Sequence, residues 1–126
     1  MTDARRSDRV AERVRACLVE AFQREMGDPG LSSMVVTTVE VPADLSMAKV
    51  GVRLLVGDED PALRRRAVLR LSHATARLRK ELAPRLGLRR VPELRFFYDT
   101  THDAARRVAE LLAEIDAERV PKRGFL

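Results

Sequence analysis

The side chains with the clearest chemistry in this sequence are the arginines and lysines between Pro61 and Arg90. Ten basic residues stand there against a single acid, Glu81, which gives the segment a formal charge of +9. Because the whole chain carries only +5, the rest of it sums to −4. The planar guanidinium group of arginine pairs with phosphate oxygens through two parallel hydrogen bonds. A basic segment within an otherwise acidic chain therefore predicts a surface that faces a polyanion.

Few other residues offer covalent or metal chemistry. Two histidines, His73 and His102, and one cysteine, Cys17, are too few for a structural zinc site. The sequence has no glycine-rich phosphate loop and no nucleophile-elbow pattern. Capping of the helix that follows explains the acidic run at 58–60. We therefore predict a protein that is not an enzyme and that uses no cofactor, metal or small-molecule substrate.

One long helical segment positions most of the basic side chains. Asp60 is a predicted N-cap and Pro61 a favourable first helical residue. On a 100° wheel, the predicted core stripe is Leu63, Ala67, Leu71, Ala74, Leu78 and Leu82. A second stripe holds Arg66, Arg70, His73, Arg77 and Lys80. Pro84 is predicted to end the helix at about Leu82 or Ala83, so that 85–92 becomes a basic loop.

Periodicity predicts the other elements. An amphipathic helix is expected from about Asp8 to Met26, and two alternating strands at 33–41 and 47–56 form an antiparallel hairpin. A third strand is predicted at 93–99. The last helix begins at about Thr100, ends at about Ala117, and carries the apolar residues Ala105, Val108, Leu111, Leu112 and Ile115. A basic tail at 119–126 is expected to be mobile.

Bulk properties narrow the class of protein. At 126 residues, with 45% apolar and 34% charged residues, the chain fits a single globular domain. It shows no secretory signal and no apolar run of the roughly 20 residues that a membrane helix needs. The lone cysteine favours a cytoplasmic location. With no Trp, one Tyr and four Phe, the chain is poorly suited to bind single strands mainly by aromatic stacking.

The order of elements is compatible with a small RNA-binding module of the KH type. The GXXG turn of that fold is absent between Pro61 and Pro92. On one face of the second strand, Lys49 and Arg53 could extend a basic surface, although charged side chains on a solvated strand are the commoner case. Fold logic alone leaves open a nucleic-acid binder, a protein–protein adaptor, or a small enzyme with a site that carries no recognisable motif.

Four sequence patterns bring the chain close to a known family. They are Asp28-Pro29-x-Leu31, Val41-x-x-Asp44-Leu45-x-x-Ala48-x-Val50, Leu78-Arg79-x-x-Leu82, and Leu88-Arg89-x-x-Pro92-x-Leu94-x-Phe96-x-x-Asp99. In this order and spacing, over roughly 7–115, the sequence resembles the bacterial ribosome-binding factor A family. The resemblance implies an α+β fold, a single KH-like (type II) domain with the order α-β-β-α-(kink)-α-β and an added C-terminal helix.

The resemblance also implies a function and a set of sites. Family members are non-enzymatic assembly factors that bind the 30S subunit and its 16S rRNA, assist late maturation including 5′-end formation, and matter most in the cold. The interhelical kink maps to Ala74, Thr75 and Ala76, where Ala76 replaces the usual glycine. The predicted RNA-binding residues are Arg66, Arg70, Arg77, Arg79, Lys80, Arg85, Arg89 and Arg90, with Lys49 and Arg53 as an extension. A monomer is expected, and a KH-like nucleic-acid binder without a ribosomal role is the alternative.

Overall fold

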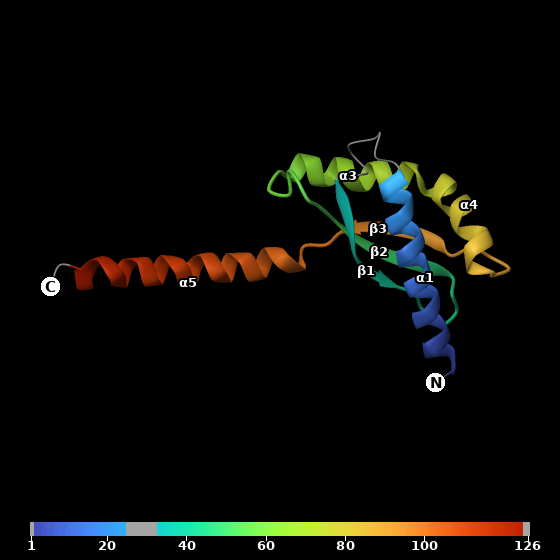
Figure 1. The fold of residues 1–126 in the computed structure, drawn as a ribbon, viewed down its shortest axis with the longest axis horizontal. Coiled ribbons are helices and arrows are strands. Elements are labelled where there is room, and N and C mark those ends of the chain that lie inside the picture. Colours follow the sequence, from blue (N-terminus) through green and yellow to red (C-terminus); the bar gives the residue numbers. More distant parts are fainter. Residues whose placement is uncertain (1, 25–32, 125–126) are drawn as a thin grey trace.

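Three strands form one sheet, with helices beside it and a last helix that leads away from it (Figure 1). The structure, a computed structural model, describes residues 2–24 and 33–124. In chain order the elements are α1 (Thr2–Arg24), β1 (Met34–Glu40), β2 (Met47–Leu54), α3 (Pro61–His73), α4 (Thr75–Leu86), β3 (Glu93–Tyr98) and α5 (Thr101–Gly124). The predicted α+β fold class, with its kink and its added C-terminal helix, is confirmed.

The sheet has the order β1-β2-β3. β1 pairs with β2 in the antiparallel sense, so the predicted hairpin is correct. β3 pairs with β2 in the parallel sense, because α3 and α4 carry the chain back across the sheet between them. The register of β1 shifts between Val36 and Thr38. This irregularity breaks the simple alternation expected for 33–41, and Val36 and Val39 both pack against the core.

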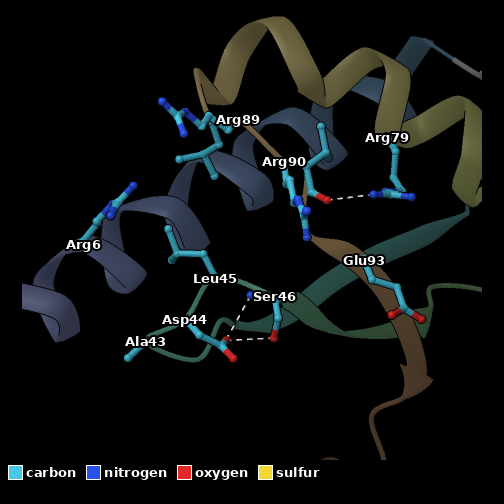
Figure 2. A pocket seen from close by; sticks show the side chains of 11 residues that line it. Arg6, Ala43, Asp44, Leu45, Ser46, Arg79, Arg89, Arg90 and Glu93 are labelled. Atoms are coloured by element: carbon cyan, nitrogen blue, oxygen red, sulfur yellow. Dashed lines mark hydrogen bonds between the residues drawn. The ribbon is translucent and has the colours of Figure 1, made fainter.

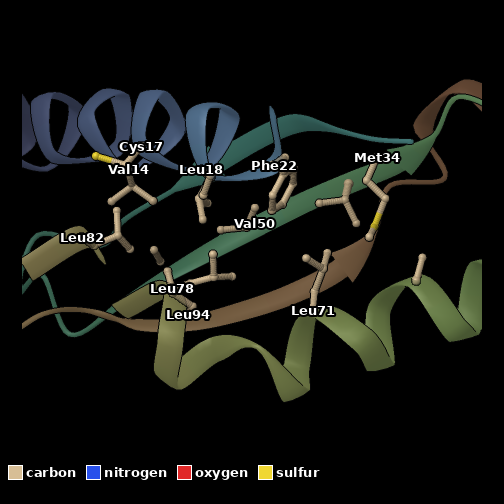
Figure 3. Close-up of a cluster of buried hydrophobic side chains, with 14 of the residues drawn as sticks. Val14, Cys17, Leu18, Phe22, Met34, Val50, Leu71, Leu78, Leu82 and Leu94 are labelled. Atoms are coloured by element: carbon tan, nitrogen blue, oxygen red, sulfur yellow. The ribbon is translucent and has the colours of Figure 1, made fainter. Parts of the chain in front are cut away.

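The core lies between the sheet and the helices α1, α3 and α4 (Figure 3). The predicted apolar stripe of α1 is buried, and Cys17 packs within it as a small apolar residue. Burial raises the pKa of the Cys17 thiol, which suits a packed residue rather than a nucleophile. The buried set is Val10, Val14, Cys17, Leu18, Ala21, Phe22, Met34, Ala48, Val50, Val52, Leu54, Ala67, Leu71, Leu78, Leu82, Leu86 and Leu94.

Some predicted boundaries and core positions are wrong. α1 begins at Thr2 rather than Asp8, and Ser7 is a buried residue within it rather than a cap. Leu63, which the wheel placed in the core stripe, is 37% exposed, and Val56 lies beyond the end of β2 with 77% exposure. The expected end of the first helix at Met26 and the 28–31 pattern lie outside the described residues.

The long helical segment is interrupted at Ala74. Its backbone φ is −90° and its ψ is 0°, and its N–H bonds to the carbonyls of both Arg70 and Leu71. The Thr75 hydroxyl donates to the Ser72 carbonyl and so offers the backbone a local alternative to a regular helix. A residue with φ near −90° needs no glycine. The break therefore forms with no glycine at Ala74, Thr75 or Ala76.

Pro84 does not end α4, contrary to the sequence prediction. It lies inside the helix, which continues to Leu86 and then stops at Gly87, whose φ of 64° is left-handed. The proline is exposed, so water can satisfy the backbone carbonyl that loses its partner. The buried Leu86 side chain holds the last turn against the core.

α5 also differs from the prediction. It runs to Gly124 rather than ending near Ala117, so the segment 119–124 is helical and not a separate tail. The apolar residues that marked this helix in the sequence are not buried: Val108, Leu111, Leu112 and Ile115 are 48 to 57% exposed. Figure 1 shows α5 leading away from the sheet, and this position explains their exposure. Residues 125 and 126 lie outside the described ranges.

Candidate nucleic-acid interface

The predicted RNA-binding side chains are all exposed. The residues on α3, on α4 and in the loop after α4 lie at the surface: Arg66, Arg70, Arg77, Arg79, Lys80, Arg85, Arg89 and Arg90. The break at Ala74 divides the stripe into one part on α3 and another on α4. Exposure makes these groups available to a ligand, and their assignment to RNA binding stays a prediction.

Several of these arginines already interact within the protein, Arg79 and Arg85 among them. Arg85 forms an ion pair with Glu20 of α1. The guanidinium group of Arg79 donates to the carbonyl of Val91, with 2.8 Å between nitrogen and oxygen. That bond fixes Arg79 beside the loop after α4 and leaves its charge without a carboxylate. Nearby, Arg24 of α1 pairs with Glu81 at 2.9 Å, so the only acid of the basic segment is also engaged.

A cavity of about 780 Å³ opens beside this loop. It is formed by the start of α1, the β1–β2 turn, α4, and the segment that leads from α4 into β3. Figure 2 shows Arg79, Arg89 and Arg90 across the cavity from Asp44 and Ser46, with Arg6 on α1 at one end and Glu93 on β3 at the other. The lining residues are Arg6, Ala43, Asp44, Leu45, Ser46, Arg79, Leu88, Arg89, Arg90, Val91 and Glu93. We call Arg6, Arg79, Arg89 and Arg90 the cavity arginines.

The β1–β2 turn has a fixed shape at the edge of this cavity. The Leu45 N–H donates to the Pro42 carbonyl at 2.9 Å, and Leu45 has the left-handed φ of 58°. The Asp44 carboxylate accepts hydrogen bonds from the Ser46 N–H at 3.1 Å and from the Ser46 hydroxyl at 2.8 Å. The Ser46 backbone bond, followed by the hydroxyl bond, lowers the pKa of Asp44. Asp44 is therefore ionised at neutral pH.

A second group of arginines, at the start of α3 and α5, is arranged differently. Arg64 forms two hydrogen bonds with Asp103, of 2.6 and 3.0 Å, and its Nη2 lies 3.4 Å from Asp58 Oδ1. Arg53 lies 3.3 Å from Asp58, and Arg106 contacts Asp58 at 3.4 Å and Asp103 at 3.2 Å. We call Arg53, Arg64, Arg106, Asp58 and Asp103 the paired cluster. It joins β2, α3 and α5.

Tyr98 of β3 completes the paired cluster. Its hydroxyl donates to Asp58 and accepts a bond from the Leu54 N–H at 3.0 Å. The guanidinium carbon of Arg64 lies 4.7 Å from the centre of the Tyr98 ring, within range of a cation–π contact. The Tyr98 hydrogen bond is the main cause that lowers the pKa of Asp58. The Arg64 hydrogen bond is the main cause that lowers the pKa of Asp103.

Sequence reasoning missed both the paired cluster and the cavity. The sequence contains one signal of the paired cluster, because Arg64 does not belong to the basic stripe on the helical wheel. The structure separates Lys49 and Arg53, the two residues of the predicted extension of the basic surface. Lys49 is exposed, with its amine 5.2 Å from the centre of the Phe97 ring, whereas Arg53 belongs to the paired cluster. Within residues 2–24 and 33–124, no helix has the length and apolar character to cross a membrane, and no three ligand-type side chains gather as a metal site would require.

Fold and surface together define the class of protein: a small KH-like α+β domain with an exposed arginine-rich face. Residues 6–112 match the family model described as ribosome-binding factor A. The chain therefore belongs to the ribosome-binding factor A family. It is 48% identical over 111 residues to the protein of that name from Sorangium cellulosum, a match that covers 88% of this chain and 89% of the relative. The Chromohalobacter salexigens protein is 38% identical over 118 residues, which cover 94% and 89% of the two chains.

Solved structures agree with this assignment. The crystal structure of ribosome-binding factor A from Thermus thermophilus matches with a TM-score of 0.61 and 29% identity, over 73% of this chain and 93% of that one. A homology model of the Thermus thermophilus factor, fitted into a cryo-EM map of a 30S complex, matches with a TM-score of 0.57 and 30% identity. That match covers 72% of this chain and 92% of the other.

Proposed function

We propose that this protein is a cytoplasmic, monomeric assembly factor that binds the small ribosomal subunit and its 16S rRNA without catalysing a reaction. It assists late maturation of the subunit, including formation of the rRNA 5′ end. The family supports the ribosomal role, since a relative has been fitted into a 30S complex. The exposed basic face of α3, α4 and the following loop supports rRNA as the direct partner.

The observation that carries the proposal is the exposure of arginines that form no ion pair with any carboxylate that the structure describes. Among the described residues, no carboxylate pairs with Arg89 or Arg90, and both are exposed beside the cavity. Exposed arginines near RNA displace condensed counterions from phosphates, and the release of these ions favours binding. Contacts of this kind hold a protein on RNA without reading its sequence. Selectivity for the small subunit then comes from the shape of the rRNA surface.

Co-sedimentation with free small subunits tests the proposal directly. We expect the protein to sediment with the subunits at low salt and to be released at high salt, because phosphate contacts weaken as salt rises. Duplex DNA at the same phosphate concentration is the competitor. Equal affinity for this DNA would contradict the ribosomal role and favour a general nucleic-acid binder.

Charge reversal tests the face itself. The variant Arg66→Glu/Arg77→Glu/Lys80→Glu should lose most of its subunit binding while it keeps the circular dichroism spectrum of the wild type. The matched control, Arg13→Glu/Arg95→Glu/Arg107→Glu, makes the same change in net charge at exposed positions on α1, β3 and α5. Equal losses in the two variants would show that binding depends on net charge alone. The basic face of α3, α4 and the following loop would then not be the binding site.

A further inference from the structure

The cavity beside the loop after α4 has a chemical division that a phosphate-binding surface does not need. Arg79, Arg89 and Arg90 lie on one side, and Asp44 and Ser46 lie on the other (Figure 2). A second carboxylate, Glu93, and the aliphatic residues Ala43, Leu45 and Leu88 also line the cavity. A duplex backbone would gain from the arginines, would be repelled by the carboxylates, and would leave the apolar lining uncovered.

The size of the hollow points to a ligand that enters it. Its volume of about 780 Å³ falls within the range of about 300 to 1,000 Å³ typical of small-molecule sites. Such sites combine an apolar lining with a few polar groups that fix the orientation of the ligand. The phosphate of a nucleotide binds a cation, and the face of its base needs a flat or apolar contact. The edge of the base needs hydrogen-bonding groups.

We propose that this cavity binds one unpaired nucleotide of a single-stranded RNA segment, an inference that rests on the proposed function. The phosphate lies against Arg6 and Arg89, which have no carboxylate partner among the described residues. The base stacks on the guanidinium plane of Arg90 and contacts Leu45 and Leu88. Its edge donates N–H groups to Asp44, which the Ser46 bonds hold in place.

The protein's composition is compatible with this mode of binding. The cavity has no aromatic residue among its described lining, so a base cannot stack on one there. Arginine planes also accept stacked RNA bases, and leucine side chains supply an apolar surface. The Val91 carbonyl holds Arg79 at one side of the cavity, so this charge is in position before the RNA arrives. The cavity is lined by Arg79 of α4 and by residues that follow the C-terminal end of this helix.

Filling the cavity without changing its charge tests the proposal. The full-length Ala43→Leu variant adds an apolar side chain at the lining, and Ala113→Leu on exposed α5 is the matched control. The probe is a fluorescently labelled, unstructured 12-nucleotide RNA, measured alone and as a duplex with its complement. We expect Ala43→Leu to weaken single-strand binding by about tenfold, the scale of one stacked base. Duplex binding and the control variant should be unchanged.

Methyl resonances give a second readout that does not depend on a variant. Addition of the single-stranded probe should move the methyl signals of Leu45 and Leu88 upfield, because an aromatic base stacked beside them shifts their resonance. The duplex should leave these signals in place. Single-strand binding by Ala43→Leu equal to that of the wild type, together with unmoved methyl signals, would overturn the inference.

The two proposals fail in different ways. If the wild-type protein sediments with small subunits but the methyl signals of Leu45 and Leu88 do not shift when the single strand is added, only the nucleotide site is wrong. If the methyl signals move but the protein does not sediment with subunits, the nucleotide site is supported and the ribosomal role is contradicted.

Discussion

At the start of α3, the arginines of the paired cluster contact two carboxylates, while the cavity arginines line an open hollow beside α4 and the loop that follows it. Both groups belong to the same short basic protein, and both use the same side chain. Arg64 is only 19% exposed and makes two hydrogen bonds to Asp103, whereas Arg89 and Arg90 are exposed beside the hollow. What separates the two groups is the set of neighbours that the fold supplies.

The existing partners of an arginine determine whether binding to RNA lowers its free energy. A guanidinium group that is already desolvated and paired must lose its partner before it can bind a phosphate, and the abandoned carboxylate then costs free energy. An exposed guanidinium group has only water and counterions to release. We therefore expect the paired cluster to hold α5 on the body of the protein and the cavity arginines to hold RNA.

The largest expected effect comes from reversing two cavity charges. Arg89→Glu/Arg90→Glu should lower the affinity for free small subunits by about 100-fold at low salt, because two attractions become two repulsions. The midpoint of thermal unfolding should remain close to that of the wild type, since neither side chain is buried. A sedimentation titration and a melting curve measure both quantities. Unchanged affinity would show that Arg89 and Arg90 do not contribute to binding of the small subunit.

Truncation of Arg64 should produce the opposite pattern. Arg64→Ala removes the closest charge partner of Asp103 and one of the three arginines that contact Asp58. The free energy of unfolding should fall by about 2 kcal/mol, the scale of lost hydrogen bonds between charged groups. Subunit affinity of the folded protein should change little. Arg65→Ala, its exposed neighbour, is the control and should cost less than about 0.5 kcal/mol. Equal losses in urea unfolding would show that the pairing contributes nothing.

Removal of one hydroxyl gives a smaller effect within the paired cluster. Tyr98→Phe deletes the group that bonds to both Asp58 and the Leu54 backbone, but keeps the ring beside Arg64. We expect a loss of about 1.5 kcal/mol in urea unfolding, at the lower end of the range for a hydrogen bond to a charged group. Stability equal to that of the wild type would mean that water replaces the hydroxyl without cost.

Acid should weaken the base of α5 in a defined window. Hydrogen bonds from Thr101 and Thr37 lower the pKa of Asp99 to about 2 from 3.8. A carboxyl whose pKa is lower in the folded state stabilises the protein above its unfolded value, and this stabilisation is lost as pH falls. Unfolding measured from pH 5 to pH 2 should therefore show a decline below about pH 4 that is shallower in Asp99→Asn. Identical curves would contradict the role of Asp99.

Periodicity predicted the parts of the fold that depend on one element at a time. The apolar stripe of α1 and the inward residues of β2 from Ala48 to Leu54 follow from spacing alone. The exposure of Leu111 and its neighbours on α5 does not follow from spacing. The spacing of apolar residues shows that a helix has an apolar side, but it does not show whether another element covers that side. The prediction that Pro84 ends α4 was wrong for a related reason. Burial of the Leu86 side chain stabilises the last turn by more than the loss of one backbone hydrogen bond at the proline costs.

The two arginine groups were beyond sequence reasoning because each is assembled from distant segments. The paired cluster joins Arg53, Asp58, Arg64, Asp103 and Arg106, and the longest of these contacts spans 48 residues of sequence. The cavity joins Arg6 to Arg90 across the β1–β2 turn. A charge count records only how many arginines there are. The tertiary fold decides which of them meet a carboxylate.

The most direct test of this division is the salt dependence of single-stranded RNA binding in two single variants. Arg89→Gln removes a cavity arginine and Arg106→Gln removes a paired one, with the same change in charge. The slope of log affinity against log salt should become shallower by about 0.7 in Arg89→Gln, the value for one lost phosphate contact. It should stay unchanged in Arg106→Gln. Equal changes in the two slopes would contradict the account.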